Sequence, residues 1–563
     1  MTDAVATVAD DVHDALMAAS PVDASLLGDH RFDTAVPDVS PAGIAATRRR
    51  LTALADRLGR IDRAASSTTD RVTLDVAAHA VAHATHDLDD RYLQTAAGPM
   101  TSGAGIGSAA AGLLAALPKL VLRDSAHAED HLTRCRRIPG WLADAEAQLQ
   151  TGVAGGCVPP ARLVVATVRM IDRYLATDQA HDPLLLAAPP GQPDPRRWRT
   201  ALGDVLATHV RPALRRHRRV LADDVAPVAR PDDAVGLVHL PDGAELYADA
   251  VQLHTMTRGT PEQQHKLGLD LVAALAEEYR ELGGRVLGST DLNEILRRLR
   301  DDPALRFTTS ETVLATAEAS LRRAERAMGD WFDGMPRIPC EVRGIPALEA
   351  PESTIAYYQP PAVDGSRPGT YYVNTTEPHL RTRFEAEALA FHESVPGHHT
   401  QIATAMELDL PMLQRVHYLT AYAEGWALYV ERLADQMGLY SDDVSRLGML
   451  SFDSWRACRL VVDTGMHAFG WSRLRAVAYM RDNSPQAPSN IANEVDRYIG
   501  WPGQALAYMA GRIRIDTLRD RARRALGRRF DVAGFHRVVL GHGAVPLHTL
   551  GQLVDAWIRN RTA

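Results

Sequence analysis

The sequence predicts a mainly helical protein of two lobes around a deep cleft. Residues 1–182 are alanine-rich and helical in period, and helical patterns continue after Thr260. A chain of 563 residues also exceeds the size at which a single hydrophobic core stops growing, which favours two lobes. A short β-rich segment before residue 376 is expected to form a small hairpin or sheet.

The boundaries between regions follow composition. Five prolines between Asp182 and Arg197 mark a loop or linker. Thr260 begins a helix well, with Pro261 at the first position and Gln263 at the third, as in a capping box. The predicted regions are an N-terminal helical region, 1–182; a central helical region, 183–335; and a metal-binding region, 336–563, in which 336–376 contains β-structure and 380–563 is helical.

Two short segments before residue 376 have the composition of strands. Residues 353–358 and 369–375 are rich in Tyr, Ile, Val and Thr, and the loop between them contains prolines and a glycine. They predict a hairpin with a long loop. Many peptidases bind an extended peptide along such an edge strand, and Tyr372 is the candidate contact. The alternative is a hairpin with a purely structural role.

The segment Phe-His-Glu-Ser-Val-Pro-Gly-His-His, residues 391–399, has the composition of a metallopeptidase site. In His-Glu-x-x-His helices, two imidazoles bind one ion and the glutamate acts as general base, which assigns His392 and Glu393. Pro396 occupies the position of the usual second histidine. In an undistorted helix His399 would lie about 10 Å further along the axis. We expect Pro396 and the next glycine to break the helix and return His398, or alternatively His399, toward His392.

A second helix, predicted from Pro411 to residue 437, supplies the third ligand. Glu424 lies in its middle among small and aromatic residues, where an unpaired buried carboxylate is costly. Its distance from His392 in the sequence fits a returning antiparallel helix, and two-histidine, one-glutamate peptidases draw a ligand from such a helix. His417 and Glu431 fall roughly on the same face and are candidates to support the ligands. Glu431 is also the fallback ligand, although a surface pair with a neighbouring arginine is favoured.

Residues 455–469 predict a third helix of this region. Arg459, Asp463 and His467 follow one another at steps of four on one face. Arg459 and Asp463 can form a pair, or Asp463 can orient an imidazole. His467 is a candidate donor to the transition-state oxygen, and the alternative is a capping histidine near the helix end.

The segment 498–514 offers groups that bind substrate. A Pro-Gly break precedes a helix that contains Tyr508, the first candidate for donating a hydrogen bond to the oxyanion, with Tyr498 as the second. Arg512 or Arg514 can bind a free substrate carboxylate by a two-pronged contact, which favours carboxypeptidase or dipeptidase action.

Several of these motifs together resemble the bacterial domain of unknown function 885 family. The segments that carry the resemblance are Ser20-Pro21, Gly28–Asp33, His392–His399, Glu424–Ala427, Arg459–His467 and Pro502–Tyr508. The resemblance covers nearly the whole chain. It implies a largely helical, gluzincin-like architecture, distantly similar to carboxypeptidase Taq and angiotensin-converting enzyme, and hydrolysis of peptide or similar amide bonds.

Composition and charge limit the partners and the cellular location that are expected for this protein. The net charge of −8 argues against nucleic acid as the main partner. No apolar run is long enough to span a bilayer, so no membrane partner is expected. The scattered cysteines, at 135, 157, 340 and 458, suit a reducing compartment, and the N-terminal residues do not resemble a secretory signal, which predicts a cytoplasmic protein.

The sequence hypothesis is a hydrolase with one Zn²⁺ per chain, held by His392, His398 and Glu424, with Glu393 as general base. Its substrate is expected to be a short peptide or small amide. The alternatives are a metal-dependent amidase or lyase acting on a modified amino acid, and a non-catalytic helical binding protein with a structural metal site. The sequence gives no indication of oligomeric state.

Overall fold

A computed structural model describes residues 2–99, 107–346, 350, 354–363, 365 and 367–562. The protein is 71% helical with one small sheet, which confirms the mainly α prediction. The helices are α1 Asp3–Ala19, α2 Pro21–Leu27, α3 Pro41–Arg60, α4 Thr68–Asp87, α5 Asp90–Gln94, α6 Ala109–Ala116, α7 Ser125–Gly155, α8 Ala161–Ala176, α9 Pro195–Val205, α10 Arg211–Arg219, α11 Gly243–Thr255, α12 Pro261–Leu287, α13 Leu292–Asp301, α14 Ser310–Ala327, α15 Ala386–Glu393, α16 His398–Glu407, α17 Met412–Val416, α18 Thr420–Gln436, α19 Asp443–His467, α20 Arg473–Asn483, α21 Pro488–Gly500, α22 Ala507–Leu526, α23 Val532–Leu540 and α24 Leu547–Thr562.

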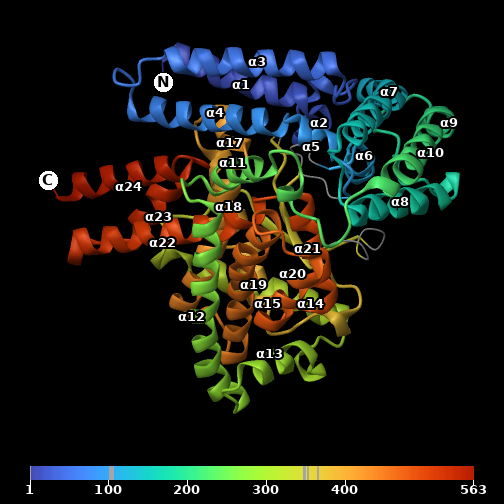
Figure 1. The fold of residues 1–563 in the computed structure, drawn as a ribbon. Coiled ribbons are helices and arrows are strands. Elements are labelled where there is room, and N and C mark those ends of the chain that lie inside the picture. Colours follow the sequence, from blue (N-terminus) through green and yellow to red (C-terminus); the bar gives the residue numbers. More distant parts are fainter. Residues whose placement is uncertain are drawn as a thin grey trace.

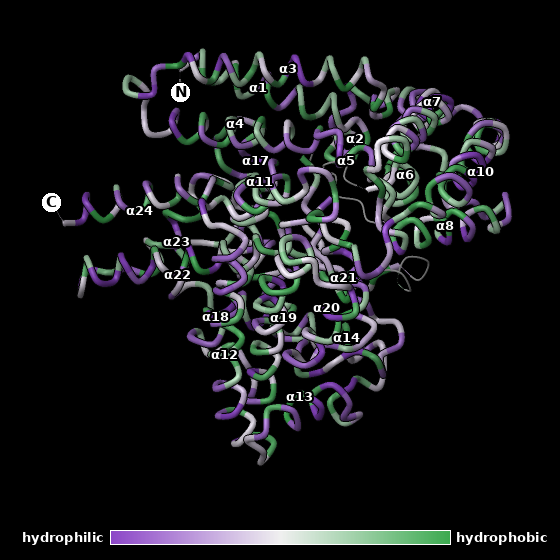
Figure 2. Tube along the Cα trace, viewed as in Figure 1, coloured by the Kyte–Doolittle hydropathy of each residue, from purple (hydrophilic) through white to green (hydrophobic). Residues whose placement is uncertain are grey.

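Helices far apart in the sequence share hydrophobic cores. α1, α3 and α4 lie along the top of the molecule, α7–α10 form a group at the upper right, and α12, α18 and α19 run through the centre (Figure 1). Most helices alternate hydrophobic and hydrophilic residues, as amphipathic helices do (Figure 2). One apolar cluster joins the first helices to α18, α22 and α24, and another draws on residues either side of the boundary predicted at residue 182. The three-region division stays a prediction.

Two helix predictions were based on local sequence signals, and the structure confirms only one of them. The capping box at Thr260 and Gln263 is present and begins α12, as predicted. The helix predicted from Pro411 to residue 437 is two helices, because the chain leaves helical geometry between α17 and α18. This break buries Leu419 in the core and lets the side chain of Tyr418 turn toward α18.

The sheet has three strands in the order β1-β3-β2. The hairpin prediction is confirmed, since β2 (Ala356–Gln359) and β3 (Gly369–Val373) are antiparallel neighbours, while residue 353 lies outside the described residues. The sequence analysis missed β1 (Cys340–Gly344), which pairs in parallel with β3. β3 is therefore central, and Tyr372 stacks on Tyr357, so the predicted placement of Tyr372 on a free edge strand is wrong, while its contact with a substrate stays a prediction.

Two glycines set the position of α18 against α22. A Cβ built on Gly511 would lie 1.7 Å from the carbonyl oxygen of Ala421, and one on Gly425 would lie 2.4 Å from the Cα of Gly511. The two backbones touch, so only glycine fits at both positions. This crossing fixes the helix that carries Glu424.

Replacing Gly511 by alanine is expected to destabilise the protein by about 3 kcal/mol or more, because the obstructing atoms belong to a backbone that cannot rotate away. Gly140→Ala is the control, since that glycine lies in α7 with open space around its Cβ position. It should be neutral or stabilising by up to about 1 kcal/mol. Denaturant unfolding of both variants measures the difference, and similar stabilities would contradict the close crossing.

Candidate metal centre

The centre is built on a sharp turn between α15 and α16. α15 ends at Glu393, and α16 begins at His398. A Cβ on Gly397 would lie 1.9 Å from the carbonyl oxygen of His392, so the turn folds back onto the end of α15 and requires glycine. The indole of Trp426 in α18 donates a hydrogen bond to the carbonyl oxygen of Pro396 at 2.9 Å. The predicted break is therefore present, and α18 holds it in place.

The turn brings His392 and His398 together around Glu424. Nε2 of His392 lies 3.6 Å and Nε2 of His398 lies 3.4 Å from Oε2 of Glu424. The two imidazole planes are nearly perpendicular, with centroids 4.8 Å apart. All three side chains are buried, and one donor atom from each lies within 4.8 Å of the others.

These distances fit a tetrahedral zinc ion. Ligand atoms about 2.0–2.1 Å from zinc lie about 3.3–3.4 Å from one another. Oε2 of Glu424 is buried and accepts no hydrogen bond, so it is free to act as a ligand. Burial opposes ionisation of Glu424, but the imidazoles of His398 and His392 hold its pKa well below the usual range. Two imidazoles and one carboxylate form the donor set of many catalytic zinc sites.

Two further side chains orient the ligands. Glu431 is fully buried, and Nδ1 of His392 donates to its Oε1 at 2.7 Å. The favoured prediction of a surface pair is wrong, because α18 turns Glu431 inward, toward α15. The hydroxyl of Tyr418 donates to Oε1 of Glu424 at 2.7 Å, which leaves Oε2 facing the histidines. Sequence reasoning missed Tyr418, because it lies in the unforeseen break between α17 and α18.

A third carboxylate, that of Glu393, lies next to the histidine ligand His392 in the sequence and accepts no hydrogen bond from the described residues. Glu393 is 9% exposed, and no hydrogen bond from a described residue reaches its carboxylate. Burial first, and then the charge of Glu393, raise the pKa of Tyr371 in β3 well above its usual range. A free carboxylate next to a ligand can accept a proton from a nearby water molecule.

His399 points away from the centre. Its Nδ1 lies 2.9 Å from the hydroxyl of Tyr358, and its Nε2 donates to the carbonyl oxygen of Ile338 at 3.0 Å. Both ring nitrogens are therefore used by the β-containing segment. Of the two alternatives, the structure brings His398 to His392 and Glu424.

The residues predicted from α19 lie in a separate buried network. Both ring nitrogens of His467 bond to backbone groups, one to the N–H of Leu237 and one to the carbonyl of Tyr498. Asp463 accepts hydrogen bonds from Tyr247 and from the N–H of Gly503, and burial raises its pKa to about 7.

Arg459 bonds to Glu494 and to the hydroxyl of Tyr498, not to Asp463. The predicted Arg459–Asp463 pair is therefore wrong. Among the described residues, His467, Asp463 and Tyr498 form no hydrogen bond with the ligands. Both nitrogens of His467 and the hydroxyl of Tyr498 have other partners, while Oδ2 of Asp463 is buried without one.

The remaining substrate-binding and supporting candidates differ in whether their polar groups are free. The hydroxyl of Tyr508 accepts a hydrogen bond from Arg497 at 3.1 Å and keeps its own proton for another acceptor. Arg512 binds both oxygens of Asp453, and Nε of Arg514 donates to a backbone carbonyl of α24, so neither faces the centre as the predicted carboxylate clamp. His417 lies at the end of α17, in contact with a cavity rather than with the ligands.

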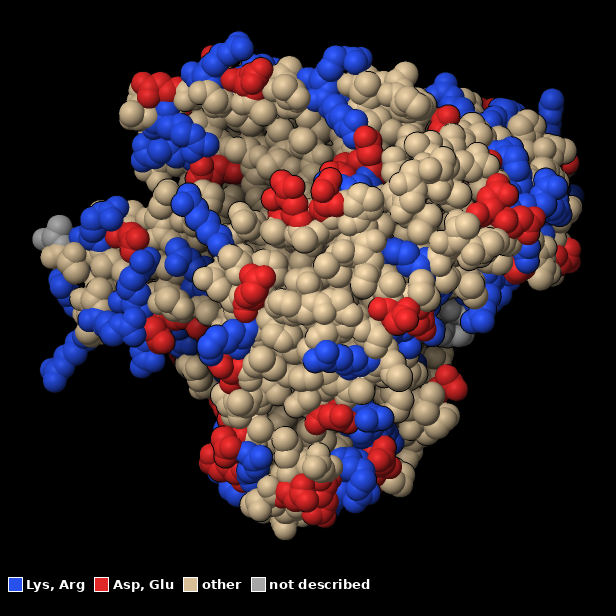
Figure 3. Space-filling view, viewed as in Figure 1, with Lys and Arg blue, Asp and Glu red and all other residues tan. Residues whose placement is uncertain are grey.

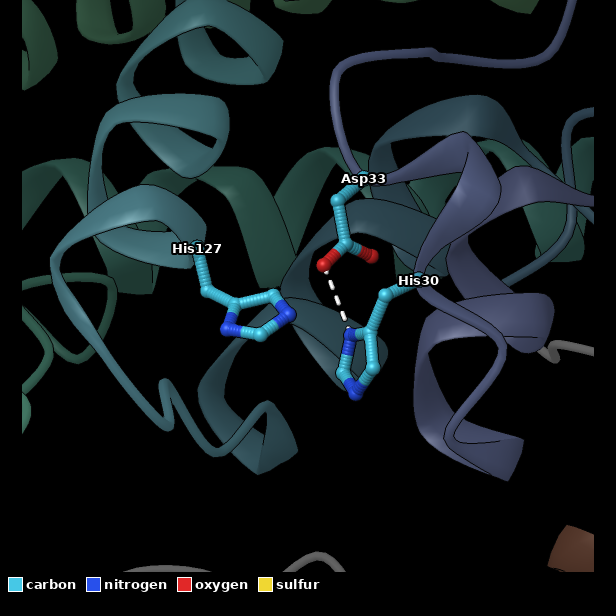
Figure 4. Close-up of side chains that lie close together, drawn as sticks. All are labelled: His30, Asp33 and His127. Carbon is cyan, nitrogen blue, oxygen red and sulfur yellow. Dashed lines mark hydrogen bonds and ion pairs between the residues drawn. The ribbon is translucent and has the colours of Figure 1, made fainter.

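In the described part of the chain a second group of potential ligands comprises His30, Asp33 and His127 (Figure 4). Oδ2 of Asp33 accepts from His30 at 2.8 Å. Its other oxygen accepts from Ser25 and lies 3.6 Å from the guanidinium of Arg134. Because Arg134 already balances this carboxylate, the group is better explained as a structural network than as a cation site.

The surface carries charges of both signs, with arginines gathered over α22–α24 (Figure 3). None of the helices in the described ranges is long and apolar enough to cross a membrane. The four cysteines are free. The expectations of no nucleic acid and no membrane partner stay predictions.

Comparison with known proteins places the chain among bacterial proteins. The family model described as bacterial protein of unknown function (DUF885) matches residues 21–554. The crystal structure of a "putative lipoprotein" from Colwellia psychrerythraea is similar, with a TM-score of 0.91 and 25% identity over 99% of each chain. A "putative lipoprotein of unknown function" from Shewanella oneidensis has a TM-score of 0.77 and 17% identity, over 98% of this chain and 99% of that one. No curated protein matches.

These descriptions overturn one prediction. Both similar structures carry the description "putative lipoprotein", which does not fit a cytoplasmic protein, so the predicted cytoplasmic location is wrong. That prediction depended on the spacing of the cysteines and on the lack of resemblance between the N-terminal residues and a secretory signal.

Replacing Glu431 by glutamine is expected to weaken zinc binding about 10- to 100-fold, because the neutral amide makes His392 a poorer donor. Asp435→Asn is the control, since that residue lies one turn further along α18 and pairs with Arg446 at the surface. Competition with a chelator measures both affinities. Equal affinities in the two variants would show that Glu431 does not support the ligand.

Proposed function

The chain belongs to the family described as bacterial protein of unknown function (DUF885), and we propose that it is a zinc-dependent hydrolase of peptide or similar amide bonds. The expected action is that of a carboxypeptidase or dipeptidase on short peptides. One observation carries the proposal: His392, His398 and Glu424 converge with a free carboxylate oxygen, and the unpartnered Glu393 lies beside them.

Each side chain of the centre has a separate role in the proposed hydrolysis. His392, His398 and Glu424 would hold Zn²⁺, which supplies a Lewis acid that makes water a nucleophile at neutral pH. Glu393 accepts the proton of the attacking water and passes it to the leaving nitrogen, which converts a poor leaving group into a neutral amine. Glu431 and Tyr418 keep the ligands in position throughout.

Tyr508 is the proposed donor to the oxyanion. Its hydroxyl accepts from Arg497 and its ring lies under the guanidinium of Arg459, with 4.2 Å between Cζ and the ring centroid. Cationic neighbours make a phenol a better hydrogen-bond donor, which suits it to a developing negative charge. His467 has no part in this proposal, because both of its nitrogens are occupied.

The proposed place of action is outside the cytoplasm. The similar structures from Colwellia and Shewanella carry the description "putative lipoprotein", and the first resembles this chain over 99% of its length. Peptides that reach the cell from outside would meet the site there.

The unpartnered carboxylate weighs against a purely structural metal site, which needs no base beside its ligand and usually leaves no open coordination position. An amidase or lyase would use the same residues on a different bond. A panel of short peptides, blocked peptides and small amides distinguishes these activities.

Replacing Glu393 by glutamine is expected to lower kcat at least about 100-fold while leaving zinc content unchanged, because the amide cannot accept the proton. Glu341→Gln is the control, since its carboxylate pairs with Arg343 at the surface of β1. Turnover is measured on the best substrate of the panel, and zinc by mass spectrometry. A Glu393→Gln enzyme that keeps its turnover would contradict the mechanism.

A further inference from the structure

A largely apolar cavity of about 210 Å³ lies between α16 and the segment that joins α17 to α18. Its apolar lining includes Pro360, Pro361, Val363, Ile402, Met406 and Val416. A cavity of about 150 Å³ accommodates benzene, so this one has room for a large aliphatic or aromatic side chain.

The cavity adjoins the candidate metal centre. Gln401 and Ile402 lie three and four residues after His398 on α16, so they share its face one turn, about 5.4 Å, further along. Ala423 lines the cavity directly before Glu424. Tyr418 lines it as well, and its hydroxyl bonds to Glu424. A peptide whose scissile bond lies at the metal centre would therefore have an adjacent side chain at the cavity.

The polar groups of the lining have unused binding capacity. Gln401 is 4% exposed, and its Oε1 is buried with no hydrogen-bond partner. Arg415 donates through Nε and Nη2 to the carbonyl oxygen of Met406, at 3.0 and 2.6 Å. No acidic side chain of the described residues pairs with it, and it is the one charged residue in the described lining. Burial lowers the pKa of His417 to about 3, so this imidazole adds no second charge.

Arg415 lines an apolar cavity, is held in place by a backbone carbonyl and has no carboxylate partner among the described residues. Such a guanidinium can bind the carboxylate of a ligand. We propose that the cavity binds the C-terminal residue of the substrate, with a bulky apolar side chain inside it and the free carboxylate on Arg415. This inference rests on the proposed function. It gives Arg415 the role that the sequence suggested for Arg512 or Arg514, both of which are engaged elsewhere.

Binding of product analogues tests the cavity without requiring turnover. Calorimetry on the zinc-loaded Glu393→Gln protein compares N-acetyl-phenylalanine with its amide and with N-acetyl-alanine. The amide and the alanine compound should each bind about 10-fold more weakly or worse, because one loses the charged hydrogen bond and the other the apolar contact. Arg415→Ala in the same background should remove the preference for the acid over the amide.

Two controls separate the cavity from other causes. Arg337→Ala removes an arginine that is 87% exposed and should change nothing. Ala405→Phe fills the cavity from α16 and should abolish the preference for phenylalanine over alanine, even if Arg415→Ala fails to fold. Equal binding of acid and amide, or an unchanged preference in Arg415→Ala, would overturn the proposal. The peptide panel decides the proposed function separately, since wild-type protein that cleaves no peptide can still bind these compounds.

Discussion

The candidate metal centre depends on the turn that joins α15 to α16. Without it, the second histidine of the segment would lie too far along a helix to meet the first. Gly397 lies so close to the carbonyl of His392 that any side chain would force the turn open. Trp426 then ties the turn to α18, two residues after Glu424. The same pair of segments therefore supplies the ligands and fixes the distance between them.

Charge is the second constraint on this site. Two buried carboxylates, Glu424 and Glu431, lie on either side of the His392 ring, and burying them without compensation would be costly. Burial alone would lower the pKa of His392, but these carboxylates raise it to about 9. The site therefore carries an excess of buried negative charge, which a divalent cation would balance under the proposed function. Glu393 keeps a free carboxylate beside this charge, which is the arrangement that a water-activating site needs.

The parts of the site that the sequence predicts are those specified by residues close together in the chain. Pro396 and Gly397 predict a break in the helix. A carboxylate such as Glu424 in an apolar helix predicts a charged or hydrogen-bonding partner. The position of His467 depends on a contact with a segment more than two hundred residues away, so local spacing misassigned it. Tyr418 was missed because it lies in the break between α17 and α18, which the sequence did not predict. β1 was missed for the same reason, because its partner follows it by more than twenty residues. The prediction of the cellular location was wrong; it depended on cysteine spacing and on the N-terminal residues, not on any contact within the fold.

The most direct test of this account is the zinc content of purified wild-type, His398→Ala and His399→Ala proteins after reconstitution and dialysis. The two histidines are adjacent and buried, but only His398 faces Glu424, at 3.4 Å. About one zinc per chain is predicted in the wild type and in His399→Ala, with none in His398→Ala. Zinc retained in His398→Ala, or no zinc in the reconstituted wild type, would contradict the account.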